Sequence, residues 1–470
     1  MGGIVIAQVD LNEMGESYYN EYIPAVITHL EEVGLVTISG GAKTIFPPGS
    51  QHEQPLIVMK SDGGFGYDST DVTAIWYRIF EQRADWIVYV TDAGQGPHFE
   101  LVFDVAKATA WKPEVRLDHM PFGLVQRLFH IARCVLPVSG DVQSADFVPR
   151  LITLLNQNGV EAIRGGVDPK QIDIQVVEAD AASEEAKKLK VALPEGFGDS
   201  NHRLLVVTIT ELAEESDAKA AADALSMDEA SSALGVTLLG PVSVRSESKA
   251  EKFKTRSGET VRLVDLLDEA VARMLRGLAV RAEEATASGQ GASGMGEEEM
   301  AEAARVLGYG AVKYADLKGN RTSNYVFSYD RMLDEKGNTA VYLLYAGARV
   351  ASILRKVASE DARGLAAVDG PSLIAAGAKM ELLQPEEIAL GSMLLRFPEK
   401  IELTLEFLLP NTLCEYVFEL CKKLTDFYAS KMCKVKGSEK QNERVLLLCA
   451  CQAVMKRCFG LLGIGYLDRI

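Results

Sequence analysis

Two short polar stretches of the sequence could bind a positively charged ligand. The first, KSDGGFGYDSTD at residues 60–71, has a phenol and carboxylates directly after a glycine-rich turn. The second, TDAGQGPHF at residues 91–99, holds a carboxylate, an amide and an imidazole. The glycines form neither a P-loop with its Lys-Ser/Thr nor GxGxxG, and the carboxylates repel phosphate. If adjacent strands carry these loops, the side chains expected to line one crevice are Tyr67, Asp71, Asp92, Gln95 and His98.

Each of these residues also has a purely structural interpretation. Asp68 suits the N-cap of the helix that follows, and Asp71 suits its first turn, where the helix dipole favours negative charge. Tyr67 could be a packed loop aromatic, Gln95 a turn residue and His98 the start of a helix. For Asp71 the two interpretations are compatible, because a carboxylate in the first turn can also face a ligand.

A third polar stretch, KFKTRSGETVRLVDLL at residues 252–267, is basic. Lys252, Lys254 and Arg256 alternate along a short loop that ends at Gly258. This stretch is either a solvated surface loop or a cationic loop that closes over a polyphosphate and stabilises its charge.

Strand and helix patterns alternate around the first two stretches. PLIVMK, DWIVYVT and VRLDHMPFGLV are typical of strands, whereas DSTDVTAIWYRIFEQ and HFELVFDVAKATAW are typical of helices. Strands joined by helices of this length predict a parallel sheet with crossover helices over residues 55–125. Ligands bind beyond the carboxyl ends of such strands, which is where both polar loops fall.

The remainder of the chain is increasingly helical. Residues 126–250 hold acidic, alanine-rich helical patterns and one strand candidate, RLLVVTIT. Residues 261–285 form a long amphipathic pattern, which a Gly/Ser-rich linker follows. From residue 297 onward almost every pattern is helical, with boundaries at Pro398 and Pro410. An α/β half followed by an all-α half is therefore the predicted organisation.

The composition is that of an ordinary globular protein. A length of 470 residues allows two to four domains, and a net charge of −17 argues against a broad grip on nucleic acid. Six of the seven cysteines lie between residues 414 and 458 without a CxxC pair, so we expect packed free thiols in a reducing compartment. We expect no signal peptide at the start of the chain, and no apolar run reaches the ~18 residues of a membrane span.

Taken together, these stretches resemble arginyl-tRNA synthetase, a class I aminoacyl-tRNA synthetase. The segments that carry the resemblance occur in the same order as in that family: PLIVMKSDGGFGYDSTDVTAIWYR, WIVYVTDAGQGPHFELVF, HMPFGLV, KFKTRSGETVRLVDLLDEA, KYADLKGNRTSNYVFSYDRMLDEKGNTAVYLLYAGARVASILRK and LLPNTLCEYVFELCKKLTDFYASKM. The similarity covers residues 13–125 and 251–470. It implies an α/β fold followed by an all-α one: a partial class I Rossmann-type parallel sheet plus a C-terminal α-helical anticodon-binding bundle.

The resemblance implies a role for each candidate residue near the sheet. The residues expected to bind arginine are Tyr67, Asp71 and Gln95. A guanidinium suits these acceptors because it only donates hydrogen bonds. ATP binding falls to Asp92 and His98 near the ribose or adenylate, and to His119, Met120, Phe122 and Gly123 around the adenine. Lys252 and Lys254 are the catalytic candidates, because they would steady the ATP phosphates while the arginine carboxylate attacks the α-phosphate.

The helical half is expected to contact tRNA. The candidate residues are Asn324, Tyr325, Tyr345 and Arg349, since aromatic and basic side chains suit single-stranded anticodon bases. Tyr345 could equally be an ordinary core aromatic. The implied activity is that of an arginine–tRNA ligase, which uses ATP with Mg²⁺, L-arginine and tRNA(Arg). We expect a cytoplasmic monomer without DNA or membrane partners, although an organelle is also compatible with the sequence.

Several features depart from the family's pattern. None of the six histidines lies in HxGH spacing, and the family's N-terminal domain and the first half of its catalytic domain are not matched. We therefore expect an uncovered sheet edge and weak or no adenylation by this chain alone. Thr255 replaces a lysine of the KMSKS-type loop, which is common in the family. Gly347 stands where a large residue is expected, which puts one tRNA contact in doubt.

The expected domains are residues 1–125, the second half of the catalytic domain; 126–250, an insertion of unknown role; 251–290, the KMSKS-type loop and connecting helix; and 297–470, the anticodon-binding domain. The insertion falls where the family has only a short hairpin, and it is either a real domain or an artefact of gene modelling. The alternative to a ligase is a noncatalytic tRNA-binding or scaffold protein derived from the synthetase.

Overall fold

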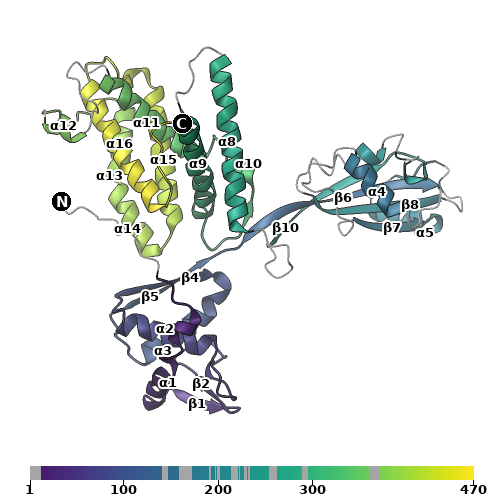
Figure 1. The fold of residues 1–470 in the computed structure, drawn as a ribbon, viewed down its shortest axis with the longest axis horizontal. Coiled ribbons are helices and arrows are strands. Elements are labelled where there is room, and N and C mark those ends of the chain that lie inside the picture. Colours follow the sequence, from purple (N-terminus) through teal and green to yellow (C-terminus); the bar gives the residue numbers. More distant parts are fainter. Residues whose placement is uncertain are drawn as a thin grey trace. The chain divides into compact units, whose positions relative to one another are not determined.

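The structure is a computed structural model, in which the chain forms two compact units (Figure 1). Unit 1 comprises Met1–Leu124, Asp316–Ser323 and Val368–Cys458, and unit 2 comprises Val125–Ala315, Asn324–Ala367 and Phe459–Ile470. The residues described are 12–139, 147–157, 172–189, 192–195, 197, 202–212, 221, 223–226, 230, 233–252, 262–287, 295–359, 370–375 and 377–470.

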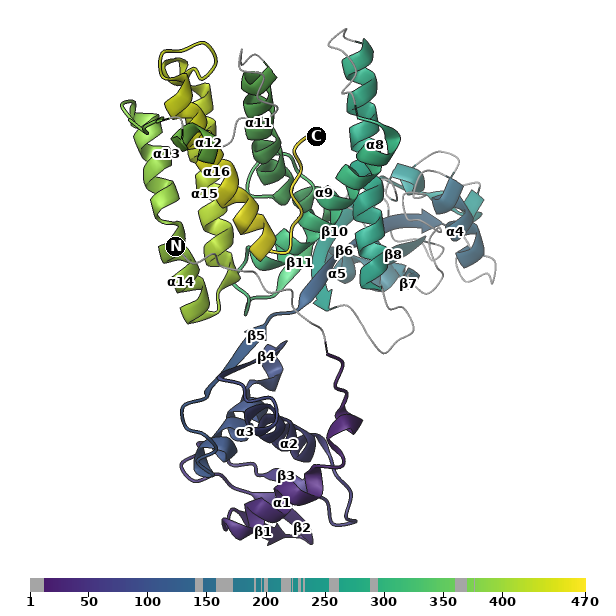
Figure 2. The ribbon, with the colours of Figure 1, turned by 60° about the vertical axis from the view of Figure 1, so that its left-hand side comes forward.

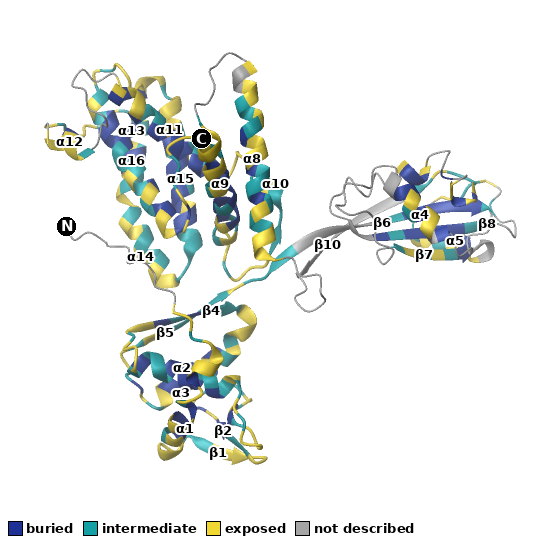
Figure 3. Cartoon of the chain, viewed as in Figure 1, coloured by how far each residue is buried: buried dark blue, intermediate teal, exposed yellow. Residues whose placement is uncertain are grey.

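The first part of unit 1 is an α/β lobe. Its elements are η1 (Glu16–Tyr19), α1 (Ile23–Glu32), β1 (Val36–Ser39), β2 (Ala42–Ile45), β3 (Leu56–Met59), α2 (Tyr67–Phe80), β4 (Trp86–Asp92), η2 (Ala93–Gln95), α3 (Gly96–Ala108) and β5 (Arg116–Phe122). Apolar side chains of α1, α2, α3 and the strands form one hydrophobic core, which includes Leu30, Ile75 and Val102 (Figure 3). Burial of these side chains is the main force that orders the lobe.

The parallel pairing expected from the strand–helix alternation is present between β4 and β5. Their register runs from Trp86 opposite Arg116 to Asp92 opposite Phe122. The expectation that β3 belongs to the same sheet was wrong for the described residues, because β3 pairs antiparallel with β2. The β1–β2 hairpin precedes β3, and β2 lies along one edge of β3. Helix α2 packs against β3. Within the described chain, β4 pairs with β5 alone, and Val90 on β4 is 58% exposed.

The segment after β5 is a long antiparallel hairpin that carries a small domain. Its arms are β6 (Val125–Ser139) and β10 (Ser243–Lys252), paired from Val135 opposite Ser243 to Gln126 opposite Lys252. Between the arms lie α4 (Phe147–Gln157), β7 (Ile172–Glu178), α5 (Ala179–Leu189), β8 (His202–Leu212) and β9 (Thr237–Leu238). The sheet order is β10-β6-β8-β7 (Figure 1).

The domain on this hairpin has its own hydrophobic cores. One core joins Cys134 and Leu136 of β6 to α4, and the other joins Val135 to α5. Successive residues of a strand point to opposite faces, so α4 and α5 cover opposite faces of the sheet. A segment with a sheet buried on both faces has the architecture of a folded domain.

The other elements of unit 2 are helical apart from one short strand. They are α8 (Leu263–Ala287), α9 (Glu297–Leu317), whose last two residues belong to unit 1, β11 (Tyr325–Phe327), α10 (Tyr329–Met332) and α11 (Ala340–Ser359). β11 pairs in parallel with β6, with Tyr325 opposite Val125. A Cβ at Gly308 of α9 would lie 2.8 Å from the backbone nitrogen of Val271 on α8, so the close approach of these two helices requires glycine.

The last helices are α12 (Gly370–Ala375), α13 (Pro385–Leu395), α14 (Phe397–Phe407), α15 (Pro410–Ala429) and α16 (Gln441–Leu461), with η5 (Lys431–Cys433) between the last two. Figure 2 shows α13, α15 and α16 side by side. Pro398 and Pro410 stand in the first turns of α14 and α15, which confirms the predicted helix boundaries. All seven cysteines are free thiols, as expected, and burial raises the pKa of Cys451 to about 12.

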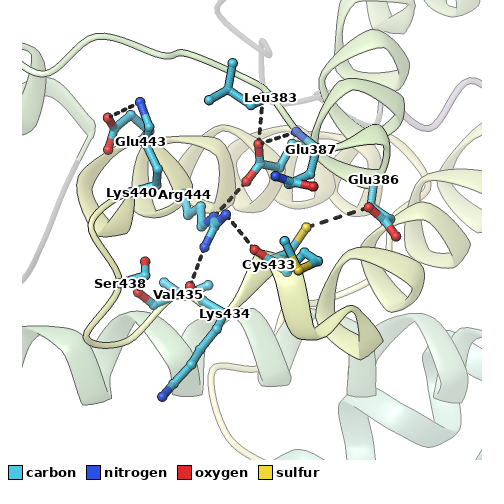
Figure 4. Close-up of polar contacts among 12 residues, drawn as sticks. Leu383, Glu386, Glu387, Cys433, Lys434, Val435, Ser438, Lys440, Glu443 and Arg444 are labelled. Carbon is cyan, nitrogen blue, oxygen red and sulfur yellow. Dashed lines mark hydrogen bonds and ion pairs between the residues drawn. The ribbon is translucent and has the colours of Figure 1, made fainter.

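A buried ion pair fixes the segment between α15 and α16 (Figure 4). The Arg444 guanidinium donates to Glu387 Oε1 at 2.7 Å and to the carbonyls of Lys434 and Met432, each at 2.7 Å. Burial alone would raise the pKa of Glu387, but hydrogen bonds from backbone N–H groups and from Arg444 hold it below its ordinary value. The pair therefore ties the η5 segment to the start of α13.

Candidate functional site

The glycine-rich stretch forms a tight turn between β3 and α2. Gly63 has a φ of +81°, a conformation that favours glycine, and the Lys60 N–H donates to the Gly64 carbonyl at 2.9 Å. The N-cap of α2 is Gly66, whose N–H donates to Ser69 Oγ at 2.9 Å. The turn therefore brings Tyr67, the first residue of α2, directly after β3.

The predicted capping roles of the two aspartates were wrong. Because Gly66 and Ser69 already form the cap, Asp68 is free to accept a hydrogen bond from the Ile57 N–H of β3 at 2.6 Å. Asp71 lies beyond the first turn of α2, and its Oδ2 is 2.7 Å from His98 Nε2 on α3. The carboxylate of Asp68 also approaches the His98 ring, with its Oδ1 3.5 Å from His98 Nδ1.

Tyr67 and Asp68 border a cavity of mixed polar and apolar lining at the surface of the lobe. Its volume is about 600 Å³, and its lining includes Glu16, Asn20 and Thr70. The Tyr67 side chain is 72% exposed, so the phenol is accessible to a ligand. The lining also includes Lys60, Ile57 and Phe65, so the carboxylates, the amide and the phenol share the cavity with one cation and with apolar side chains. The acceptors among them suit a ligand that donates hydrogen bonds.

The second polar stretch follows β4 as expected, but its members take different roles. Asp92 caps η2 by accepting from the Gly94 N–H at 2.9 Å, and Gln95 is the exposed last residue of η2. Only His98 of this stretch contacts Asp71 in the described structure. The hydrogen bond to Asp71 raises the pKa of His98, more than burial lowers it.

The residues expected around the adenine lie at the end of β5. His119 Nε2 is 2.8 Å from Thr91 Oγ1, and burial, together with the charge of Arg321, lowers the pKa of His119. Met120 is half-buried, whereas Phe122 is 43% exposed. Gly123 donates its N–H to the carbonyl of Arg321 at 2.5 Å.

Arg321 is a residue of this region that the sequence did not single out. Its Nη1 donates to the Pro121 carbonyl at 2.7 Å, and its Nε donates to the Leu408 carbonyl at 2.8 Å. One side chain thus holds the end of β5 and the turn between α14 and α15. The only sequence signal is an arginine in a loop, NRTSN, and nothing local indicates its distant partners.

The two lysines that the sequence predicts to be catalytic lie at the end of β10 and in the segment that follows it. Lys252 is the last residue of β10, opposite Gln126, and its side chain lies outside the described residues. Lys254, with Thr255 and Arg256, lies wholly outside them.

The candidate tRNA contacts fall on two elements of unit 2. Asn324 and Tyr325 lie at β11, and Tyr345 and Arg349 lie one turn apart on α11. Tyr345 lines a cavity of about 200 Å³ whose other residues include Arg281, Met300 and Ile470. The Arg281 guanidinium lies 5.2 Å from the centre of the Tyr345 ring, and burial raises the pKa of Tyr345 to about 12.

Gly347 has a packing reason to lack a side chain. A Cβ there would lie 2.9 Å from Cε2 of Tyr466, and the Tyr466 hydroxyl donates to the Gly347 carbonyl at 2.9 Å. The space that a large residue would need on α11 is thus filled from the C-terminal segment by Tyr466, which the sequence did not indicate.

Comparison with known proteins first defines the class. The family profile of class I (R) tRNA synthetases, catalytic domain, matches residues 5–130 and 240–329, and that of the DALR anticodon-binding domain matches residues 343–470. The chain is therefore built from parts of a class I aminoacyl-tRNA synthetase. Residues 131–239, which include most of the domain on the β6–β10 hairpin, fall outside both matches.

Individual relatives then specify the family. The chain is 35% identical over 462 residues to the chloroplastic/mitochondrial arginine–tRNA ligase of Arabidopsis thaliana, covering 97% of this chain and 50% of that protein. It is also 35% identical to the cytoplasmic enzyme of the same plant, covering 97% and 54%. With the two domain matches, this similarity shows that the chain belongs to the arginyl-tRNA synthetase family, and it spans about half the length of the curated relatives it matches.

Solved structures agree on the fold. Arginyl-tRNA synthetase from Plasmodium falciparum aligns with a TM-score of 0.61 at 24% identity, covering 98% of this chain and 55% of that chain. The Thermus thermophilus enzyme aligns with a TM-score of 0.57 at 16% identity, covering 96% and 58%. The predicted fold, an α/β catalytic region with parallel strands followed by a helical anticodon-binding region, is confirmed. Within the described part of the chain, no helix is long and apolar enough to cross a membrane.

Proposed function

We propose that this chain carries the arginine-recognising and anticodon-binding parts of an arginine–tRNA ligase. The ligase activates L-arginine with ATP to arginyl-adenylate and transfers it to tRNA(Arg). The observation that carries this proposal is the set of acceptors at the start of α2, where Tyr67 is exposed on a surface cavity and Asp71 already bonds to the imidazole of His98. Such a set selects a guanidinium over neutral side chains.

The adenylation step is an in-line displacement, so the protein contributes positioning and charge stabilisation. Asp71, Tyr67 and Gln95 hold the arginine side chain, so that its carboxylate faces the α-phosphate. Asp92, His98 and the end of β5 (His119, Met120, Phe122 and Gly123) receive the nucleoside, whereas Lys252 and Lys254 balance the phosphate charge. We propose that Mg²⁺ arrives with ATP.

The helical part receives the anticodon of tRNA(Arg). Support comes from the cavity at Tyr345, where an aromatic ring, the Arg281 guanidinium and apolar side chains offer stacking and charge together. The Tyr345 hydroxyl is buried beside the Arg281 guanidinium, which interacts with it electrostatically. Asn324, Tyr325 and Arg349 are proposed as further tRNA contacts.

Two finer proposals concern this chain by itself. The 470 residues contain no HxGH, the motif that stabilises the transition-state phosphate, so we expect them alone to adenylate arginine weakly or not at all. The free thiols support a reducing compartment, for which we propose the cytoplasm, and we propose a monomer. The alternative function, a noncatalytic tRNA-binding or scaffold protein, is favoured by the same missing motif.

Arginine-dependent ATP–pyrophosphate exchange tests the activity of the chain, and wild-type-like exchange from these residues alone would refute the expected weakness. Filter binding tests the tRNA proposal. We expect a salt-sensitive preference for tRNA(Arg) that Tyr345→Ala reduces, whereas Tyr428→Ala, an exposed tyrosine of α15, leaves it unchanged. Equal retention of all tRNAs would contradict the proposed recognition of tRNA(Arg).

A further inference from the structure

A histidine already bonds to Asp71, the carboxylate that we assign to arginine binding. His98 of α3 lies between two aspartates of α2, with Nε2 2.7 Å from Asp71 Oδ2 and Nδ1 3.5 Å from Asp68 Oδ1. The three side chains are partly buried, with exposed fractions of 20% for His98, 26% for Asp68 and 29% for Asp71. Solvent therefore screens these contacts only in part.

The charged form of His98 fits this position better than the neutral form. An imidazolium donates from both ring nitrogens and can satisfy both carboxylates, whereas a neutral imidazole donates from only one. Asp68 depends less on His98, because its other oxygen already accepts from the Ile57 N–H. Asp71 also interacts with the charge of Arg78, but His98 is the side chain that forms a hydrogen bond with it among the described contacts.

Among the described residues, Asp71 and Asp68 are the negative charges that interact with His98. Phe99 of α3 packs edge-on against its ring at 5.2 Å, and Arg78 and Tyr89 interact with Asp71 rather than with His98. His119 of β5 lies near Gly96, at the start of the same helix. The two aspartates of α2 are thus the charged groups that determine the state of His98.

We propose that His98 stands in for the guanidinium of arginine in the empty site and loses a proton to solvent when arginine binds Asp71. The inference rests on the proposed function, because it takes Asp71 as an arginine ligand. The guanidinium cannot lose its own proton, so when two cations meet one carboxylate it is the imidazole that becomes neutral. No covalent bond forms, and the charge at Asp71 stays balanced before and after binding.

The proposal predicts that the affinity for arginine rises with pH. The bond to Asp71 raises the pKa of His98 in the empty protein, and loss of that bond to arginine lowers it again. Arginine therefore binds weakly where His98 is protonated and tightly where it is neutral. The affinity should rise by about tenfold per pH unit below the raised pKa of His98 and level off above it.

Isothermal titration of the full chain with L-arginine, from pH 5.5 to 8, tests this proposal in buffers of different ionisation enthalpy. We expect release of close to one proton per arginine at the acidic end and none at the alkaline end. His98→Gln should abolish both the proton release and the pH dependence. His52→Gln is the matched control, because His52 pairs with Glu100 at 2.8 Å in the same lobe but outside the site.

A second readout needs no variant. In the wild-type chain labelled at histidine, the NMR titration midpoint of His98 should fall when saturating arginine is added. A pH-independent arginine affinity, or a His98 midpoint that arginine leaves unchanged, would overturn the inference while leaving the arginine site intact. Absence of arginine binding by the wild type and by His98→Gln at every pH would instead overturn the proposed function, and the inference with it.

Discussion

Gly347 on α11 offers a substitution whose sign can be worked out from the packing around it. Gly347→Ala places a methyl group 2.9 Å from Cε2 of Tyr466, well inside ordinary carbon–carbon contact. The ring must therefore retreat, and it is held by its bond to the Gly347 carbonyl at 2.9 Å and by Phe459, 6.0 Å away between ring centres. Losing the bond costs about 1 kcal/mol, and losing the aromatic contact costs about 1 kcal/mol.

The same substitution also brings a gain, because alanine favours a helix interior over glycine by about 1 kcal/mol. The net effect of Gly347→Ala is then a loss of about 1 kcal/mol in local stability, or roughly fivefold faster amide hydrogen exchange in α11 and the C-terminal segment. In a Tyr466→Ala background the obstacle is gone. There Gly347→Ala should slow amide exchange by a similar factor. The effect of Gly347→Ala on exchange therefore has opposite signs with and without the Tyr466 ring.

Gly277 is the matched control. It lies in the interior of α8, where a Cβ would meet nothing closer than the Arg281 side chain at 4.0 Å, so Gly277→Ala should slow exchange in either background. Mass spectrometry of peptides from residues 340–359 and 463–470 gives the rates for Gly347→Ala, and peptides from residues 263–287 give those for Gly277→Ala. Slower exchange in Gly347→Ala with Tyr466 intact would refute the reasoning, because it would mean that the ring does not limit the space at Gly347.

Two further perturbations test other parts of the structure. Arg444→Met leaves Glu387 buried without its partner and should lower the unfolding free energy by about 3–5 kcal/mol in thermal melts, whereas Lys440→Met, which removes a partly exposed pair, should cost less than about 1 kcal/mol; equal losses would contradict the assigned burial. Replacing residues 136–242 by Asn-Gly should close β6 and β10 into a hairpin, since Val135 already faces Ser243, and leave hydrogen exchange in α2 and α3 unchanged. Faster exchange there would show that the domain on the β6–β10 hairpin supports the lobe.

Much of the fold could be predicted from local sequence. The boundaries of α14 and α15 follow from prolines that cannot continue a preceding helix, and β4 and β5 follow from short apolar runs. The turn before Tyr67 follows from its glycines. These features depend on the conformational preferences of residues that are neighbours in the chain, so the chain encodes them locally.

The candidate site could be predicted only in outline. The spacing of Tyr67 and Asp71, four residues apart, places both on one face of any helix that contains them. That Asp68 accepts from Ile57 rather than capping α2 depends on how β3 lies against the helix. That His98 reaches Asp71 depends on the packing of α3 against α2, which no local pattern specifies.

The sequence by itself determined the family, the order of the elements and the acidic character of the loop after β3, because these depend on residue type and local spacing. The tertiary structure decided which groups meet. Arg321 bonds to Pro121, two hundred positions away, Tyr466 fills the space beside Gly347, and β6 pairs with β10 around a domain with its own cores. The reason is that buried polar groups and apolar faces must find partners wherever the fold brings them, and the identity of those partners is a property of the packed chain.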